Sequence, residues 1–252
     1  MTTPAGTTKL EVVRVAALAD LHYGRYSAST LQTVLAQAAS AADILVVCGD
    51  LTDHGLPDEA HALARELNQV VKVPIVAVLG NHDHESQQVE AIVGHLREAG
   101  IVVLDGDAYE IHGIGFAGAK GFCGGFGPRT LGAWGEGVIK QFVQEAVSEA
   151  LKLESALARL RTTHRIALLH YSPVQSTVDG EPCEIYPFLG SSRLEEPLLR
   201  YDVSAVFHGH AHHGQLEGRT TKGAPVYNVS LPLRQRRTPD RPFHVLEFRV
   251  AD

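Results

Sequence analysis

Cysteine is scarce in this sequence of 252 residues: only three are present, and they lie far apart. Cys48, Cys123 and Cys183 form no CxxC pair and no repeated spacing, which excludes a disulfide framework and the usual thiolate zinc motifs. An odd number of separated thiols is typical of a protein in a reducing compartment, so we expect a cytoplasmic location. Cys48 lies inside an apolar run and is predicted to be a small core residue.

Long apolar runs are missing as well. No stretch approaches the roughly 20 apolar residues that a helix needs to cross a bilayer. Residues 1–6 also lack the charged start and the apolar core of a secretory signal. We therefore expect neither a membrane span nor a membrane partner.

Positive charge is in deficit, because 29 Asp and Glu side chains outnumber 22 Lys and Arg and the formal net charge is -7. A protein that binds long nucleic acids needs a basic surface for the phosphates, so we expect no nucleic-acid groove. The one basic run holds Arg234, Arg236, Arg237 and Arg241 and is interrupted by Pro239. We interpret it as a solvated face near the C-terminus.

The remaining composition is typical of one folded domain. Hydrophobic residues make up 44% of the chain and charged residues 20%, which excludes extensive disorder. Because no internal repeat or linker divides the chain, we expect a single domain over residues 1–252. The compositional outlier is histidine, with 14 residues, six of which cluster around positions 82–84 and 208–213.

Short apolar runs alternate with stripes of helical spacing in the first 110 residues. Runs rich in Val and Ile predict strands that are buried on both faces, and they occupy residues 12–19, 44–48 and 73–79. The apolar stripes predict helices, and they lie at residues 31–38, 60–70 and 89–96. This alternation predicts an α/β fold with a largely parallel sheet and right-handed crossovers.

The second half is less regular. Ten glycines fall between Gly113 and Gly137, where we expect a loop. A long apolar stripe after it predicts a helix over residues 138–161. Four further strands are expected, two of them buried, and they lie at residues 166–169, 203–207, 225–229 and 243–248.

The predicted buried strands share one feature, because a potential metal ligand follows each of them. A single Asp at such a place is usually a turn former or a helix cap, and a single His usually a surface or core residue. Five strands that all end in this way are better explained by a site, since the loops of an open α/β sheet converge at the carboxyl ends of its strands. The residues are Asp20 and His22, Asp50 and Asp53, Asn81 to Asp83, His170, and His210 with His212.

The types of ligand indicate the kind of metal. Carboxylates, imidazoles and one amide oxygen, without any thiolate, suit divalent Mn, Fe, Zn or Co. Seven ligands are too many for one ordinary ion, but they suit two adjacent ions that share a bridging carboxylate. Two such ions would remain net positive after the carboxylates are counted, and would acidify a bridging water and attract a phosphate.

The ordered series DxH, GDxxD, GNHD, an isolated His and GHxH spans residues 20–212 and resembles the calcineurin-like metallophosphoesterase family. The resemblance implies two β-sheets packed face to face with helices outside, a four-layer α-β-β-α sandwich. It also implies that Asp50 bridges two ions and that the other six ligands form two sets: Asp20, His22 and His212 on one ion, and Asn81, His170 and His210 on the other.

The same resemblance implies roles for three residues beside the metals. His82 matches the histidine that acts as general acid or contacts the phosphate. Asp83 is expected to orient His82, and Asp53 is expected to support a ligand from behind.

The resemblance further implies a metal-dependent phosphoric ester hydrolase in which a metal-bridging hydroxide attacks phosphorus. The protein phosphatase branch has Arg after the second Asp of GDxxD and Glu after GNH, whereas this chain has His54 and Asp83. It looks more similar to the bacterial cyclic-nucleotide phosphodiesterases, so we expect small phosphodiesters as substrates. The alternatives are a phosphomonoesterase or nucleotide pyrophosphatase of the same family, and a non-catalytic, metal-stabilised binding scaffold.

Some features remain open at this stage. The sequence assigns no role to His54, His84, His208 and His213, and it allows a homo-oligomer without requiring one. Residues 118–134 and 171–190 fit either the rim of the active site or plain surface loops.

Overall fold

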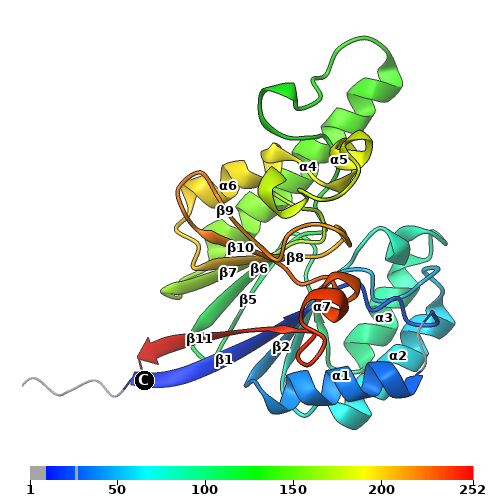
Figure 1. Ribbon diagram of the computed structural model, residues 1–252, viewed down its shortest axis with the longest axis vertical. Helices are drawn as coiled ribbons and strands as arrows, with labels where there is room; N and C mark the ends of the chain where they lie inside the picture. The colour runs from blue at the N-terminus through cyan, green and yellow to red at the C-terminus, as the bar shows by residue number, and fades with distance from the viewer. Residues whose placement is uncertain (1–9, 26–27, 252) are drawn as a thin grey trace, which may run out of the picture.

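Two β-sheets pack face to face, and helices cover both outer surfaces (Figure 1). The computed structural model describes residues 10–25 and 28–251, and residues 1–6, which we expected to carry no secretory signal, lie outside them. The layers follow the predicted order α-β-β-α. None of the helices in the described part of the chain is both long and apolar enough to span a membrane.

The first sheet contains the three strands predicted in the N-terminal half. Its order is β11-β1-β2-β3-β4, in which β1 to β4 run parallel and β11 is antiparallel to β1. Most of this sheet is parallel, as predicted. Its strands are β1 (Leu10–Leu18), β2 (Ile44–Cys48), β3 (Ile75–Val78), β4 (Val102–Val103) and β11 (His244–Ala251).

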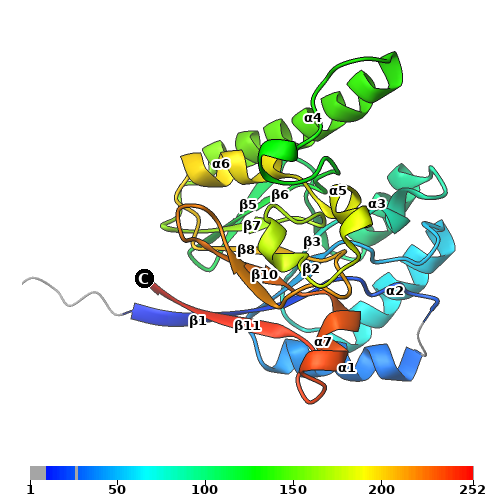
Figure 2. The same ribbon diagram turned by 45° about the horizontal axis from the view of Figure 1, so that its top comes forward.

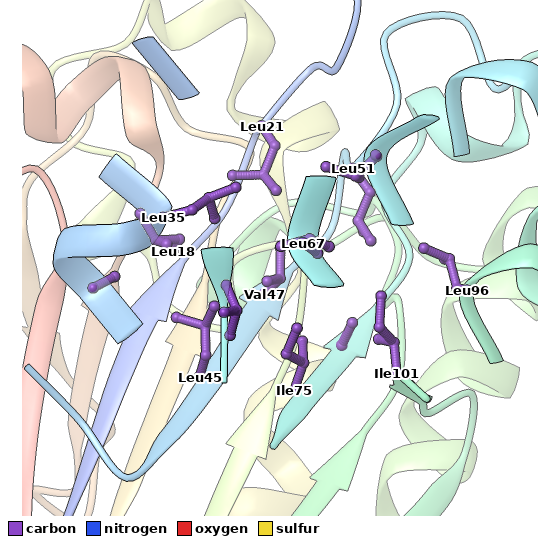
Figure 3. Packing of buried hydrophobic residues seen from close by; sticks show 14 of the residues in the cluster. Leu18, Leu21, Leu35, Leu45, Val47, Leu51, Leu67, Ile75, Leu96 and Ile101 are labelled. Atoms are coloured by element: carbon purple, nitrogen blue, oxygen red, sulfur yellow. The ribbon is translucent and has the colours of Figure 1, made fainter. Parts of the chain in front are cut away.

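Alternate side chains of these strands serve two different cores. Leu45 and Val47 of β2 point to the helical layer, where they meet residues such as Leu35 and Leu67 (Figure 3). The helices of this layer are α1 (Ala28–Ser40), α2 (Pro57–Val70) and α3 (Val89–Glu98). Each fully buried Leu of this kind contributes about 1.5–3 kcal/mol to folding.

The other face of β2 points to the second sheet. Val46 and Cys48 are fully buried there, in one cluster with Phe116 and Phe207. Cys48 is therefore the core residue that the sequence predicts. Because both faces of the strand are buried, the apolar run is continuous rather than alternating.

The second sheet has the order β5-β6-β7-β8-β10-β9, with antiparallel strands at its two edges. The central strands β6, β7, β8 and β10 are parallel. The strands are β5 (Asp107–Ile111), β6 (Ile114–Gly118), β7 (His164–Leu168), β8 (Ala205–His208), β9 (Glu217–Arg219) and β10 (Pro225–Asn228).

Strand β6 corrects one prediction, because the glycine-rich region from Gly113 onward was expected to be a loop. Glycines usually weaken a strand pattern, but here they allow close packing of the two sheets. A Cβ atom on Gly118 would lie 2.6 Å from Leu104 Cβ and 2.7 Å from Val78 Cγ1. The glycine is therefore required by its neighbours in the first sheet rather than by a turn.

Helices α4 (Gly137–Arg159) and α6 (Glu195–Arg200) cover the outer face of the second sheet (Figure 2). Leu153 and Leu157 of α4 pack with Ala167 and Val206 of the sheet. The predicted helix over residues 138–161 is thus confirmed. Between α4 and α6 the chain forms α5 (Tyr186–Leu189) and short 3-10 turns at Gln175–Thr177, Cys183–Ile185 and Ser192–Leu194.

Helix α7 (Leu231–Arg237) corrects the prediction for the basic run. Arg234 is only 4% exposed, and its Nε donates a hydrogen bond to the carbonyl of Asn228 at 3.2 Å. It lies one turn after Leu231, on the buried face of the helix, so it cannot be part of a solvated face. Arg236, Arg237 and Arg241 are exposed as predicted.

Candidate metal centre

The segments that follow β1, β2, β3, β7 and β8 meet at one edge of the two sheets. Main-chain hydrogen bonds join them directly: Asp20 N donates to Gly49 O at 3.0 Å, and Gly209 N donates to His170 O at 3.2 Å. The 3-10 turn η1 (His82–His84) follows β3 at the same edge. Residues up to 192 positions apart in the sequence are therefore neighbours here.

The first ligand group consists of Asp20, His22 and His212. One potential ligand atom from each lies within 4.8 Å of the others. His212 Nε2 is 3.1 Å from Asp20 Oδ1, and the rings of His22 and His212 are 5.6 Å apart. This is the set that the family resemblance assigns to one ion.

The second ligand group consists of Asp50, His170 and His210, again with ligand atoms within 4.8 Å. The amide oxygen of Asn81 belongs to the same place, because Oδ1 is 2.9 Å from His170 Nε2. The structure therefore also brings together the set that the resemblance assigns to the other ion.

Asp50 lies between the two groups. Its Oδ2 is 3.8 Å from His22 Nε2, and its Oδ1 is 3.4 Å from His170 Nε2. The two oxygens of one carboxylate thus face histidines of different groups, which is the arrangement that a bridging ligand requires. Oδ1 also accepts a hydrogen bond from the backbone N–H of His82 at 2.9 Å.

The donors in the structure fit two divalent ions. Asp20 and Asp50 are almost fully buried carboxylates, and buried charges are costly unless cations compensate them. His22 is 1% exposed, its Nδ1 faces the Asp53 carboxylate at 3.2 Å, and its Nε2 makes no hydrogen bond within the described residues. A buried imidazole nitrogen without a partner is expected where it serves as a metal ligand.

Main-chain carbonyls fix the orientation of the two histidines in the second group. His170 Nδ1 is 3.0 Å from Cys48 O, and His210 Nε2 is 3.1 Å from Phe188 O. A carbonyl oxygen only accepts hydrogen bonds, so these nitrogens carry the protons. The opposite nitrogens, Nε2 of His170 and Nδ1 of His210, remain available to an ion.

The backbone at the site is strained. Asp20, His22, Asp50 and His210 have positive φ angles of 58°, 41°, 49° and 68°. Each such residue costs of order 1–3 kcal/mol and persists only where the surroundings fix it, as at functional sites. Close approach also requires Gly209, because a Cβ atom there would lie 2.5 Å from Asp20 Oδ2.

The charges of the site are coupled. Burial by itself would raise the pKa of Asp20, but the hydrogen bond and the charge of His212 hold it below its usual value. Burial disfavours the protonated form of His170. The charge and hydrogen bond of the Asp50 carboxylate favour that form more strongly and raise the pKa of His170 to about 9. Burial lowers the pKa of His210 to about 4. An ion entering here must displace the proton of His170.

His82 lies beside the first group, with its ring 4.5 Å from that of His22 and its side chain 33% exposed. Its Nδ1 lies 2.6 Å from the main-chain carbonyl of Asp53. That nitrogen must carry a proton, which leaves Nε2 as the atom that gains or loses one. His82 Nδ1 also lies 3.8 Å from the Glu85 carboxylate.

Asp83 does not orient the ring of His82, which corrects the prediction. Its buried carboxylate accepts hydrogen bonds from the N–H groups of Thr52 at 2.9 Å and Gly80 at 2.8 Å, and from the Thr52 hydroxyl at 2.6 Å. Burial, together with the nearby Asp50 carboxylate, raises the pKa of Asp83 to about 6. Asp83 thus holds the loop of Asp50 against the loop of Asn81.

Asp53 supports the ligand His22 on the side away from the ion, because its Oδ1 lies 3.2 Å from His22 Nδ1.

The four unassigned histidines lie outside both ligand groups. His208 is buried between Gly209 O and Thr177 Oγ1, each at 2.8 Å. His54, His84 and His213 are exposed, and His54 Nε2 is 3.5 Å from an Asp53 oxygen.

The segments 118–134 and 171–190 do reach the site. The ring of Tyr171 packs at a tilt against that of His210, with centroids 4.5 Å apart, and Phe188 supplies the carbonyl that meets His210 Nε2. The two segments are tied together by the hydrogen bond from Gly124 N to Pro187 O at 2.7 Å. Sequence reasoning missed the Cys48 and Phe188 carbonyls, because a main-chain acceptor leaves no signal in residue type.

Comparisons with known proteins agree with this geometry. The family model for calcineurin-like phosphoesterases matches residues 13–214. No sequence among the curated proteins matches the chain.

Among solved structures, the phosphopantetheinyl hydrolase of Mycobacterium tuberculosis superposes with a TM-score of 0.65 at 16% identity, over 92% of this chain and 95% of that one. The protein TT1561 of Thermus thermophilus superposes with a TM-score of 0.52 at 14% identity, over 95% of this chain and 99% of that one. At these identities the likeness supports the fold alone.

Proposed function

This chain belongs to the calcineurin-like phosphoesterase family, and on that premise we propose that it is a two-metal hydrolase of small phosphodiesters, with cyclic nucleotides as leading candidates. Phosphoester hydrolysis follows from the family. The single observation that supports the two-metal arrangement is the Asp50 carboxylate, whose two oxygens face histidines of both ligand groups.

Each ion would have its own set of ligands. Asp20, His22 and His212 would hold the first, Asn81, His170 and His210 would hold the second, and Asp50 would be shared. Oxygen and imidazole donors suit Mn, Fe, Zn or Co. When bound, such ions supply an acidified water as nucleophile and stabilise the charge on the phosphate oxygens.

His82 would handle the proton of the leaving group. Its Nδ1 is engaged by Asp53 O, so only Nε2 can deliver a proton. The 33% exposure of the side chain beside His22 supports access of a substrate to this histidine. The Asp50 oxygen that accepts the His82 N–H fixes the backbone of this turn.

The preference for diesters rests on charge. Two divalent ions carry four positive charges; two ligating carboxylates and a hydroxide nucleophile leave one. A diester monoanion neutralises that charge, whereas a monoester dianion exceeds it. No Arg follows Asp53 or Asp83 to clamp a dianion bidentately, because His54 and His84 stand at those positions.

The test compares two aryl substrates with the same leaving group. We expect kcat/KM for bis(p-nitrophenyl) phosphate to exceed that for p-nitrophenyl phosphate, with equal manganese and pH. Cyclic AMP and cyclic GMP then test the candidate substrates. A clear excess for the monoester contradicts the diester preference, and no turnover of any phosphate ester by metal-loaded protein favours the binding scaffold.

A further inference from the structure

Strand β11 leaves one long edge of the first sheet open. It lies beside β1 (Figure 1), and within the described part of the chain its main-chain hydrogen bonds to other main-chain groups join it to β1 alone. The other three sheet edges are shorter: β4 has two residues, β9 three and β5 five, against eight in β11. Proteins usually shorten or cover such edges, because their unpaired N–H and C=O groups can bind another strand.

The backbone of β11 is regular enough to accept a second strand. It contains neither Pro nor Gly, and all eight residues are in register with β1 without a bulge. Among the residues that the structure describes, the one side chain that bonds to this backbone is His164, whose Nε2 lies 2.9 Å from Arg249 O. A carbonyl oxygen has two lone pairs, so Arg249 O can still accept a bond from a partner strand.

Two exposed charges on β11 indicate which strand would fit. Glu247 and Arg249 lie two positions apart, so they point to the same face of the sheet. On β1, Glu247 is opposite Arg14, whereas Arg249 is opposite Val12, which is uncharged and 51% exposed. Neither Glu247 nor Arg249 forms an ion pair inside the described ranges. The best partner strand would place a carboxylate opposite Arg249 and a cation opposite Glu247.

Strand β11 of a second copy meets this requirement. When two such strands pair antiparallel about a two-fold axis at Phe248, Glu247 of each copy lies opposite Arg249 of the other. Charges of one sign would block this pairing, whereas these form two attractive pairs. An axis moved by one residue places Glu247 opposite Glu247 or Arg249 opposite Arg249, so the charges also select the register.

We propose that the protein forms a two-fold dimer in which β11 pairs with β11 of a second copy, with Glu247 opposite Arg249 in both halves of the interface. The two five-stranded sheets then form one continuous sheet. Because the interface uses the open β11 edge of both copies, the assembly is closed at two chains. No metal ligand comes from β11, so this inference does not depend on the proposed function.

Sedimentation velocity over a concentration series tests the interface. We expect the wild type to dimerise reversibly. Arg249→Glu places two carboxylates opposite each other in both halves and should raise the dissociation constant of the dimer roughly 100-fold, because like charges directly opposite destabilise paired strands. Glu247→Arg makes the same test with two cations.

The exchange of both charges in one chain is the sharper experiment. Glu247→Arg combined with Arg249→Glu restores two attractive pairs, and should return the dissociation constant to within about threefold of the wild-type value. Arg237→Glu is the matched control, because it reverses the charge of an exposed arginine on α7. It should leave the dissociation constant unchanged. The Tm of each variant shows whether the fold is kept.

Three results would overturn the inference. The first is a wild type that stays monomeric up to the limit of its solubility; slow hydrogen exchange along β11 in that monomer would show that another segment of the same chain covers the edge. The second is an unchanged dissociation constant in folded Arg249→Glu and Glu247→Arg. The third is a charge exchange that fails to restore the dimer.

Discussion

Each ligand group has two buried residues and one partly exposed histidine, so the groups differ not in burial but in what holds the far nitrogens of their histidines. In the second group, main-chain carbonyls lie against the far nitrogens of His170 and His210. In the first group, the far nitrogen of His22 faces the Asp53 carboxylate. The ring of His82 lies beside His22 of this group, and Arg236 donates to the carbonyl of His212.

This difference suggests different roles for the two metal positions. Ligands whose far nitrogens are fixed by main-chain carbonyls are suited to keep an ion in place. We infer that the second ion is the more tightly held, and that the first ion, which lies beside His82, is on the side of the leaving group.

The largest effect is expected where the two positions meet. Asp50→Ala should lower the occupancy of both ions and reduce activity to near background, because one carboxylate serves both groups. Metal content by elemental analysis and kcat measured with excess manganese are the two readouts. Asp43→Ala, at a partly exposed residue paired with Arg14, is the control. Retention of two ions in Asp50→Ala would contradict a shared ligand.

A smaller effect is expected from a residue that serves chemistry without holding an ion. His82→Ala should keep both ions and lower kcat by roughly 10²–10⁴-fold, as for loss of a general acid. The decrease should be largest for substrates with poor leaving groups. His84→Ala tests the exposed histidine of the same turn and should have little effect. Unchanged turnover of a poor leaving group by His82→Ala would remove the role assigned to this residue.

The comparison of the two groups has its own test. After dialysis against a chelator, His212→Ala should keep about one ion per chain, because it removes a ligand of the first position only. His170→Ala should lose the second ion and bind it roughly 10–100-fold more weakly or worse. Isothermal titration with manganese gives both affinities. Equal losses in the two variants would show that the main-chain carbonyls do not make the second position the tighter one.

The smallest effect concerns His244, a histidine outside both ligand groups. Its titration changes the stability of the fold at low pH without changing the protonation of a metal ligand. Burial, with Arg234 and Arg241 nearby, lowers the pKa of His244 to about 4. Because the unfolded chain binds this proton near pH 6.5, stability is full above that pH and falls as the pH drops toward 4.

His244→Phe keeps the stack on Tyr227, where the ring centroids are 4.1 Å apart, and removes the titrating group. We expect a smaller loss of Tm between pH 7 and pH 5 than in the wild type, worth about 1–3 kcal/mol in stability. Metal-free samples of both proteins remove any contribution from bound ions. Identical pH profiles would exclude His244 as a source of acid sensitivity.

The sequence predicts the strand ends well, because strands buried on both faces leave continuous apolar runs and their ends carry unusual residue types. Asp50 and His170 are found in this way without reference to any contact. Strand β6 is not, because Gly118 is required by side chains of the other sheet, and packing across sheets has no local pattern. Strand β6 can be predicted only when the side chains that face it from the other sheet are known.

Roles that depend on contacts between distant segments are harder still. Asp83 binds the backbone of Thr52, 31 positions earlier, although its place next to His82 predicted a contact with that ring. Arg236 is similar: its charge is plain in the sequence, but its contact with His212 depends on how α7 docks. Residue type predicts the ligands, whereas tertiary contacts determine what surrounds them.

The central claim is that two ions, shared through Asp50, are needed for hydrolysis. The most direct measurement is a manganese titration of metal-free protein in which bound ions per chain and the rate with bis(p-nitrophenyl) phosphate are followed together. We predict little activity with one ion bound and full activity at two ions per chain. Full activity at one ion per chain, or any hydrolysis by protein shown by elemental analysis to be metal-free, would contradict the account.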